Sequence, residues 1–224
     1  MIDCRAPTSL PLRRIDRRIA IAGRRVDYSI DMAVEGVHAS VEAARLAESL
    51  VAARVACERR MVRVAALMPS GRPVAMVRGK AAALSVTVSH CGGMIAAAVC
   101  ETAGVGIDVV DPAEAGRSLD VWFTPDELSL LPDEDGLLRA RLWGAKEAAF
   151  KAARLDDGFR PCSVEICTLG RTGYRWSVRG EHGPVEGRGT FMMAGMHLLA
   201  IAVATDCAAA DARPPSAAEV AACS

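Results

Sequence analysis

Lysine is scarce in this sequence. Only three of the 27 basic residues are lysines, Lys80, Lys146 and Lys151, so arginine supplies nearly all of the positive charge. Two of the three lie in one short segment, WGAKEAAFK (143–151), whose other residues are typical of a buried helix apart from Glu147. Because arginine is the usual basic residue here, we interpret these two lysines as selected for a site.

A net charge is also lacking. The 27 basic residues equal the 27 acidic ones, so no overall field draws the protein to nucleic acid or to a membrane surface. Two arginine-rich stretches, PLRRIDRR (11–18) and AGRRVDY (22–28), leave nucleic-acid binding open as an alternative. Each stretch contains an aspartate, which weakens that alternative, and we expect no nucleic-acid partner.

The eight cysteines form no CxxC pair, and none has the spacing to histidine that a zinc site requires. We therefore interpret them as reduced thiols. The first ten residues, MIDCRAPTSL, contain no apolar core of a secretion signal. Together these absences predict a cytoplasmic protein.

Long hydrophobic runs are missing too. The longest run, FMMAGMHLLAIAVAT (191–205), includes His197 and is shorter than the roughly 20 apolar residues that a membrane-spanning helix needs. We interpret it as a buried strand and expect no membrane association.

The residues that are present predict a mixture of helices and strands. Apolar residues recur at helical spacing in some segments and alternate or run continuously in others. The expected helices are 33–57, 123–131 and 137–155. The expected strands are 61–68, 84–90, 93–100, 104–110, 162–169, 174–178 and 197–205.

The order of these elements repeats along the chain. A long helix, a strand, a turn and a strand beginning near a histidine occur first up to residue 100 and again from residue 137. This predicts an α+β fold of two similar halves, each a helix packed on an antiparallel sheet, forming a pseudo-dimer. We place the halves at 1–104 and 105–207, with a flexible tail at 208–224, and expect the active site between the halves.

Charged residues at two points suggest a metal and a polyanion. Asp108 ends a strand of apolar residues, where a carboxylate is costly to bury unless it is paired or binds a cation. Glu147 and Lys151 share a helical face with Trp143 and Phe150, so that face points inward. Two carboxylates suit Mg²⁺ with substrate phosphates. The alternatives are a turn-capping aspartate and a surface Glu–Lys pair.

Two further segments carry candidate residues. Ser89 and His90 stand at a strand end, where a phosphate contact or a purely structural role is open. Glu127 follows Thr124 and Pro125 in the pattern of a capping box, which competes with any role as a general base.

These residues carry a resemblance to a known family. GVGIDVV (104–110) followed by WGAKEAAFK (143–151) resembles the paired motifs of the 4′-phosphopantetheinyl transferases. SGRP (70–73), SVTVSH (85–90) and FTPDEL (123–128) resemble further motifs of that family. The similarity spans residues 59–205 and points to the larger pseudo-dimeric class, similar to the activator of surfactin synthetase. The first 58 residues are expected only to be helix-rich and basic.

The resemblance implies transfer of phosphopantetheine from coenzyme A to a serine of an acyl or peptidyl carrier protein, with release of 3′,5′-ADP. It implies that Asp108 and Glu147 bind Mg²⁺, that Lys151 contacts the transferred or leaving phosphate, and that Lys146 supports Lys151.

It further implies that Arg72, Ser89 and His90 hold the 3′-phosphate of coenzyme A and that Glu127 is the base. We expect a monomer.

Two positions depart from the family pattern. Val110 stands where the larger class usually has a second acid, and strand alternation turns Asp111 away from Asp108. Gly144 stands where a hydroxyl or thiol residue is usual. A non-catalytic module that binds coenzyme A or carrier protein is therefore kept as the alternative.

Overall fold

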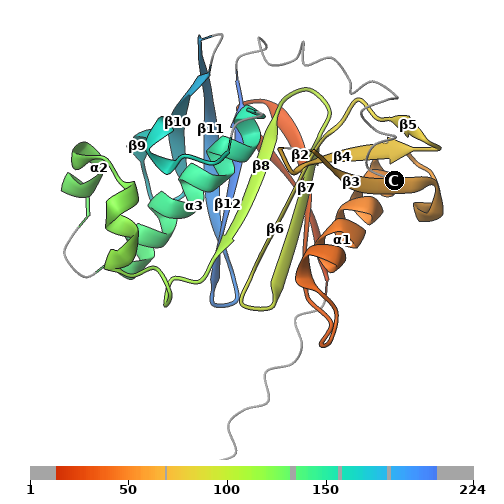
Figure 1. Cartoon of the computed structure of the whole chain (residues 1–224), viewed down its shortest axis with the longest axis horizontal. Helices are drawn as coiled ribbons and strands as arrows, with labels where there is room; N and C mark the ends of the chain where they lie inside the picture. Colours follow the sequence, from red (N-terminus) through yellow and green to blue (C-terminus); the bar gives the residue numbers. More distant parts are fainter. Residues whose placement is uncertain (1–13, 69, 132–134, 156–157, 181–182, 206–224) are drawn as a thin grey trace, which may run out of the picture.

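The computed structural model describes residues 14–68, 70–131, 135–155, 158–180 and 183–205. Helices cover antiparallel sheets, so the expected α+β class is confirmed (Figure 1). The predicted tail at 208–224 lies outside the described residues. Among the described residues, no helix combines the length and apolar character required to cross a bilayer.

The first half of the chain builds a four-stranded sheet in the order β1-β2-β7-β6 and a small sheet in the order β3-β4-β5. Helix α1 (Ala39–Arg54) packs on this part through small and branched apolar residues such as Ala47 and Leu50. The strands are β1 (Ile15–Ile21), β2 (Arg24–Met32), β3 (Val62–Leu67), β4 (Arg72–Val77), β5 (Lys80–Ala81), β6 (Ser85–Cys91) and β7 (Met94–Cys100).

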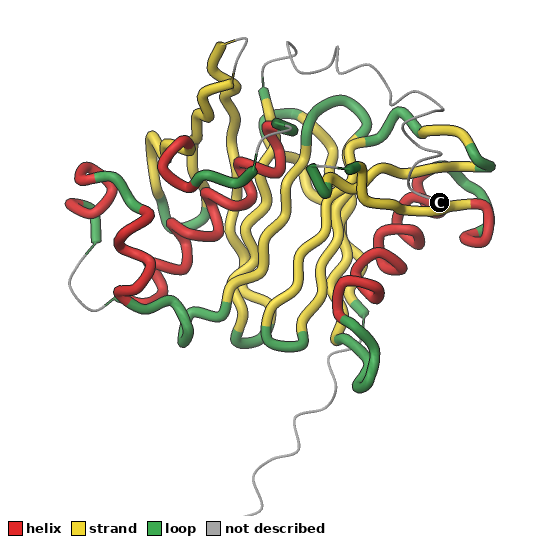
Figure 2. The backbone as a smooth tube through the Cα atoms, viewed as in Figure 1, coloured by secondary structure: helices red, strands yellow, loops and turns green. Residues whose placement is uncertain are grey.

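The second half builds a five-stranded antiparallel sheet in the order β8-β12-β11-β10-β9, with α3 (Gly136–Ala153) lying across it (Figure 2). A 3₁₀ helix, η2 (Arg117–Trp122), and the short helix α2 (Pro125–Ser129) connect β8 to α3. The strands are β8 (Val105–Val110), β9 (Val164–Leu169), β10 (Gly173–Gly180), β11 (Gly183–Ala194) and β12 (His197–Ala204).

The two halves share an order of elements and pairings. Strand β2 precedes α1 and pairs with the last strand of its half, β7, as β8 precedes α3 and pairs with β12. The strands after each helix form hairpins, β3 with β4 and β9 with β10. This order is compatible with the predicted pseudo-dimer, which stays a prediction, as does the boundary after residue 104.

The N-terminal region differs from the expectation. Residues 15–32 form the β1–β2 hairpin rather than helix, and the helix predicted over 33–57 begins only at Ala39. Ala22 and Gly23 both have positive φ, which suits a two-residue hairpin turn. The branched and aromatic residues of β2 bury one face on β7, which favours strand over helix.

The apolar run at 191–205 is not the single buried strand that the sequence predicts. It contains the end of β11, a turn at Gly195 with φ of 61°, and β12. The run is continuous in sequence because β12 is buried on both faces and the end of β11 adds the buried Phe191 and Ala194.

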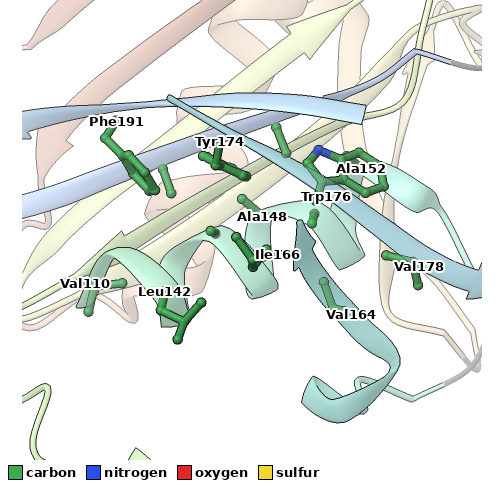
Figure 3. Close-up of a cluster of buried hydrophobic side chains, with 14 of the residues drawn as sticks. Val110, Leu142, Ala148, Ala152, Val164, Ile166, Tyr174, Trp176, Val178 and Phe191 are labelled. Carbon is green, nitrogen blue, oxygen red and sulfur yellow. The ribbon is translucent and has the colours of Figure 1, made fainter. Parts of the chain in front are cut away.

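Small residues let α3 approach the sheet closely. The helix presents Ala148 and Ala152, while the strands contribute the large side chains Tyr174, Trp176 and Phe191, which lie between helix and sheet (Figure 3). The same principle acts on β8, because a Cβ at Gly106 would overlap the carbonyl oxygen of Ala148. Glycine at 106 therefore holds β8 against α3, two residues before Asp108.

Candidate active site

The site forms where α3 meets β8. Glu147 and Lys151 are one helical turn apart, and Lys151 reaches across to the strand. The Lys151 Nζ lies 2.8 Å from Asp108 Oδ1 and 3.3 Å from Glu147 Oε2. It also donates to the carbonyl oxygen of Ile107 at 3.1 Å. The structure thus brings together three of the residues that the sequence predicted.

Burial sets the electrostatics of this cluster. Burial, reinforced by the neighbouring Asp108 carboxylate, raises the pKa of Glu147 to about 7. Burial alone would lower the pKa of Lys151, but the Asp108 and Glu147 carboxylates outweigh it and raise that pKa. The ammonium is therefore charged at neutral pH, between two carboxyl groups that repel each other.

The donor set fits a hard divalent cation in part. Asp108 and Glu147 supply carboxylate oxygens, and a bound cation would relieve the repulsion between the two carboxylates. No group of three His, Cys, Asp or Glu residues arranged to hold a metal occurs in the described part of the chain. Val110 is buried, and a Cβ at Gly144 would lie 3.1 Å from its Cγ2 atom, so the two departures from the family pattern pack together.

A cavity of about 310 Å³ opens beside the cluster, between the two halves. The first half contributes 70–73 and 85–88, and the second half contributes the C-terminal end of α3 and the following loop. Arg72, Lys151 and Arg154 bring positive charge, while Phe150 and Phe159 bring aromatic surface. A cavity lined by both cations and aromatic rings suits a ligand that joins phosphates to an apolar or aromatic group.

Arg72 lines the cavity. Its Nη1 donates to the carbonyl oxygen of Arg154 at 3.1 Å, which ties β4 of the first half to the end of α3. Arg154 was missed by the sequence analysis. It is the C-cap residue of α3 with a left-handed φ of 55°, so helical spacing does not predict its position at the cavity.

Ser89 and His90 are separated by strand alternation. The Ser89 hydroxyl is buried and donates to Asp108 Oδ1 at 2.8 Å. His90 is exposed and shares its strand face with Val88, which lines the cavity two positions earlier. The two residues therefore point in different directions, and both stand next to the cavity-lining part of β6, since Thr87 on the Ser89 face and Val88 on the His90 face line the cavity.

Lys146 does not lie at the cavity, and the expectation that it supports Lys151 is corrected. Its side chain is 0% exposed, and its Nζ lies 2.8 Å from Glu127 Oε2. It also donates to the carbonyl oxygens of Val164 at 2.6 Å and Pro161 at 3.1 Å. Successive helical residues point about 100° apart, so Lys146 and Glu147 face different neighbours.

Glu127 belongs to the same buried cluster. The predicted capping box is present, since Thr124 N donates to Glu127 Oε2 at 2.8 Å and the Glu127 amide bonds the Thr124 hydroxyl. Its Oε1 accepts from the Ile166 amide at 3.1 Å. Both carboxylate oxygens are thus engaged by donors, which supports a structural role for Glu127.

The five cysteines in the described part of the chain are free thiols: Cys57, Cys91, Cys100, Cys162 and Cys167.

Comparison with known proteins gives one family. Residues 104–189 match the model of the 4′-phosphopantetheinyl transferase superfamily, whereas no curated protein matches the chain. The matched segment includes Asp108, Glu147 and Lys151, the three residues that the structure brings together. The chain therefore carries, at residues 104–189, a domain of the 4′-phosphopantetheinyl transferase superfamily.

Proposed function

We propose that this protein transfers 4′-phosphopantetheine from coenzyme A to a serine of an acyl or peptidyl carrier protein and releases 3′,5′-ADP. The observation that supports this most is the Asp108–Lys151–Glu147 cluster, which lies inside the family match and beside a cavity with further cations. We further propose that the chain acts as a cytoplasmic monomer of the larger, pseudo-dimeric class.

The reaction asks the protein mainly to position groups and neutralise charge. A bond forms between the serine oxygen and the phosphorus that carries pantetheine. The bond from that phosphorus to the oxygen that leaves with 3′,5′-ADP breaks, and the serine proton passes to solvent. The carrier serine is the nucleophile, so the enzyme needs none of its own.

Each residue of the cluster has a proposed part. Asp108 and Glu147 would hold Mg²⁺, which when bound supplies positive charge to the diphosphate. Lys151, which lines the cavity, neutralises phosphate charge as a point charge. Arg72 and His90 bind the 3′-phosphate of coenzyme A. Lys146 and Glu127 serve the fold instead, by fixing α2 against α3 and β9.

Ion pairs within the protein engage part of the described arginine-rich stretches. Asp27 forms ion pairs with Arg18 at 2.6 Å, with Arg54 at 2.9 Å and with Arg25 at 3.8 Å. Their charge is thus partly neutralised within the protein, which disfavours the nucleic-acid alternative.

The proposal is tested by incubating the protein with coenzyme A, Mg²⁺ and a panel of fatty-acid, polyketide and peptide carrier proteins. Intact mass spectrometry is expected to show one added phosphopantetheine on at least one carrier, and a carrier whose acceptor serine is replaced by alanine serves as control. Binding of coenzyme A without modification of any carrier would instead support the non-catalytic binding module.

A further inference from the structure

The two large sheets meet edge to edge, and their neighbouring strands are not paired by regular backbone hydrogen bonds. Strand β6 ends the first sheet and β8 begins the second, and they lie next to each other (Figure 1). Side-chain hydroxyls of β6 accept hydrogen bonds from backbone amides of β8. The pairs are Ser85 with Val105 at 3.0 Å, Thr87 with Ile107 at 3.3 Å and Ser89 with Val109 at 3.2 Å.

We call Ser85, Thr87 and Ser89 the hydroxyl ladder. Within the described residues, Ser89 is the member whose hydroxyl also reaches a carboxylate, Asp108 Oδ1 at 2.8 Å. A serine hydroxyl has a single proton to donate, so that proton is committed to Asp108 while the oxygen accepts from the Val109 amide. Ser89 is therefore fixed by both of its bonds.

Asp108 is in turn held from both halves of the molecule. Its Oδ1 accepts from Ser89 of the first half and from Lys151 of the second half, each at 2.8 Å. The side chain of Asp108 is only 5% exposed, so water does not substitute readily for either donor. Two donors on one oxygen set the orientation of the whole carboxylate group.

We propose that Ser89 is a positioning residue that orients Asp108 for the metal, rather than a ligand of the 3′-phosphate of coenzyme A. This inference rests on the proposed function, because it takes Asp108 as a metal ligand. Ser89 is 8% exposed, and its hydroxyl is already engaged by Asp108 and by the Val109 amide, which leaves its proton unavailable to a phosphate. Partners that orient a metal ligand from behind commonly tune both affinity and geometry.

The test compares three variants of the full chain. Ser89→Ala removes the bond to Asp108 together with one ladder bond, and Ser85→Ala removes a ladder bond alone. Ser89→Thr keeps a hydroxyl, and Thr87 shows that threonine fits the ladder. Mn²⁺ binding is measured without coenzyme A, by the loss of the free-ion electron paramagnetic resonance signal, beside the melting temperature of each variant.

We expect Ser89→Ala to weaken Mn²⁺ binding by roughly 10- to 100-fold. Ser89→Thr should recover most of the affinity, and Ser85→Ala should bind Mn²⁺ like the wild type although it loses comparable thermal stability. A positioning role also predicts that Ser89→Ala raises KM for coenzyme A and for dephospho-coenzyme A by the same factor.

Two results would overturn the inference while leaving the proposed function intact. The first is that Ser89→Ala binds Mn²⁺ with wild-type affinity. The second is that Ser89→Ala raises KM for coenzyme A but not for dephospho-coenzyme A, which would make Ser89 a phosphate ligand. Failure of the wild type to bind Mn²⁺ and to modify any carrier protein would instead refute the proposed function, and the inference with it.

Discussion

Replacing Lys146 by methionine tests whether this lysine stabilises the fold or takes part in catalysis. Methionine keeps much of the side-chain length but removes the ammonium, which is bound to Glu127 and to two backbone carbonyls in a fully buried position. The Glu127 carboxylate, whose side chain is 3% exposed, would keep two amide donors but lose its counter-charge.

The magnitude follows from the burial of the pair. Removing one partner of a buried ion pair costs about 3–5 kcal/mol of unfolding free energy, because the remaining charge is left uncompensated. For a chain of this size each kcal/mol corresponds to roughly 2–4 °C, so we expect the melting temperature to fall by about 6–20 °C. The double variant Lys146→Met/Glu127→Leu should recover part of this loss, because no buried charge remains.

The assay is thermal unfolding followed by circular dichroism, beside turnover measured below the melting temperature of each variant. Lys151→Met is the matched control, the same substitution on the same helix at a side chain that is 28% exposed. Lys146→Met should lose stability and keep its affinity for coenzyme A, whereas Lys151→Met should lose turnover with a smaller loss of stability. Wild-type stability of Lys146→Met together with abolished turnover would refute the structural assignment.

Three further predictions follow from single contacts. Burial holds the folded-state pKa of Glu147 near 7, above its ordinary 4.5, so this group's stabilising contribution is complete below pH 4.5 and is lost as the pH rises through 7. Between pH 4.5 and pH 7, the melting temperature of the metal-free wild type should fall more than that of Glu147→Gln. Equal falls in the two proteins would contradict the raised pKa of Glu147. His90→Ala should weaken the binding of coenzyme A by roughly tenfold or more and the binding of dephospho-coenzyme A much less. Equal losses of affinity for the two ligands, measured by calorimetry, would make His90 structural. Gly106→Ala should lower the unfolding free energy by roughly 1–3 kcal/mol or more, because the added Cβ would overlap the Ala148 carbonyl oxygen. An unchanged unfolding free energy in a urea titration would show that α3 does not pack closely on β8 at this position.

The sequence was sufficient where local patterns and spacing decide the outcome. The helical rule placed Glu147 and Lys151 on one inward face, and the Thr124–Glu127 capping box is present as expected. Motif order brought Asp108 to the same place, although the residues are distant in sequence. These predictions hold because adjacent helical turns and strand ends have fixed geometry.

Other features depend on contacts that the sequence does not display. Lys146 stands next to Glu147, and only the packing of β9 against α3 shows that it turns inward to Glu127. The bond from Ser89 to Asp108 depends on how the two sheets meet. The β1–β2 hairpin does leave a sequence signal, the Ala22-Gly23 turn between two stretches with branched residues, but it is weaker than the signal of the alanine-rich helix that follows.

The most direct test of the account is phosphopantetheine transfer by Asp108→Asn across a Mg²⁺ titration. Asparagine keeps the shape of the side chain and an oxygen that can accept from Ser89 and Lys151, but it removes the negative charge. The account predicts that Asp108→Asn stays folded, binds Mg²⁺ far more weakly and loses most of its transfer to the carrier protein. Wild-type rates at every Mg²⁺ concentration would contradict the claim that Asp108, Glu147 and Lys151 form the catalytic centre.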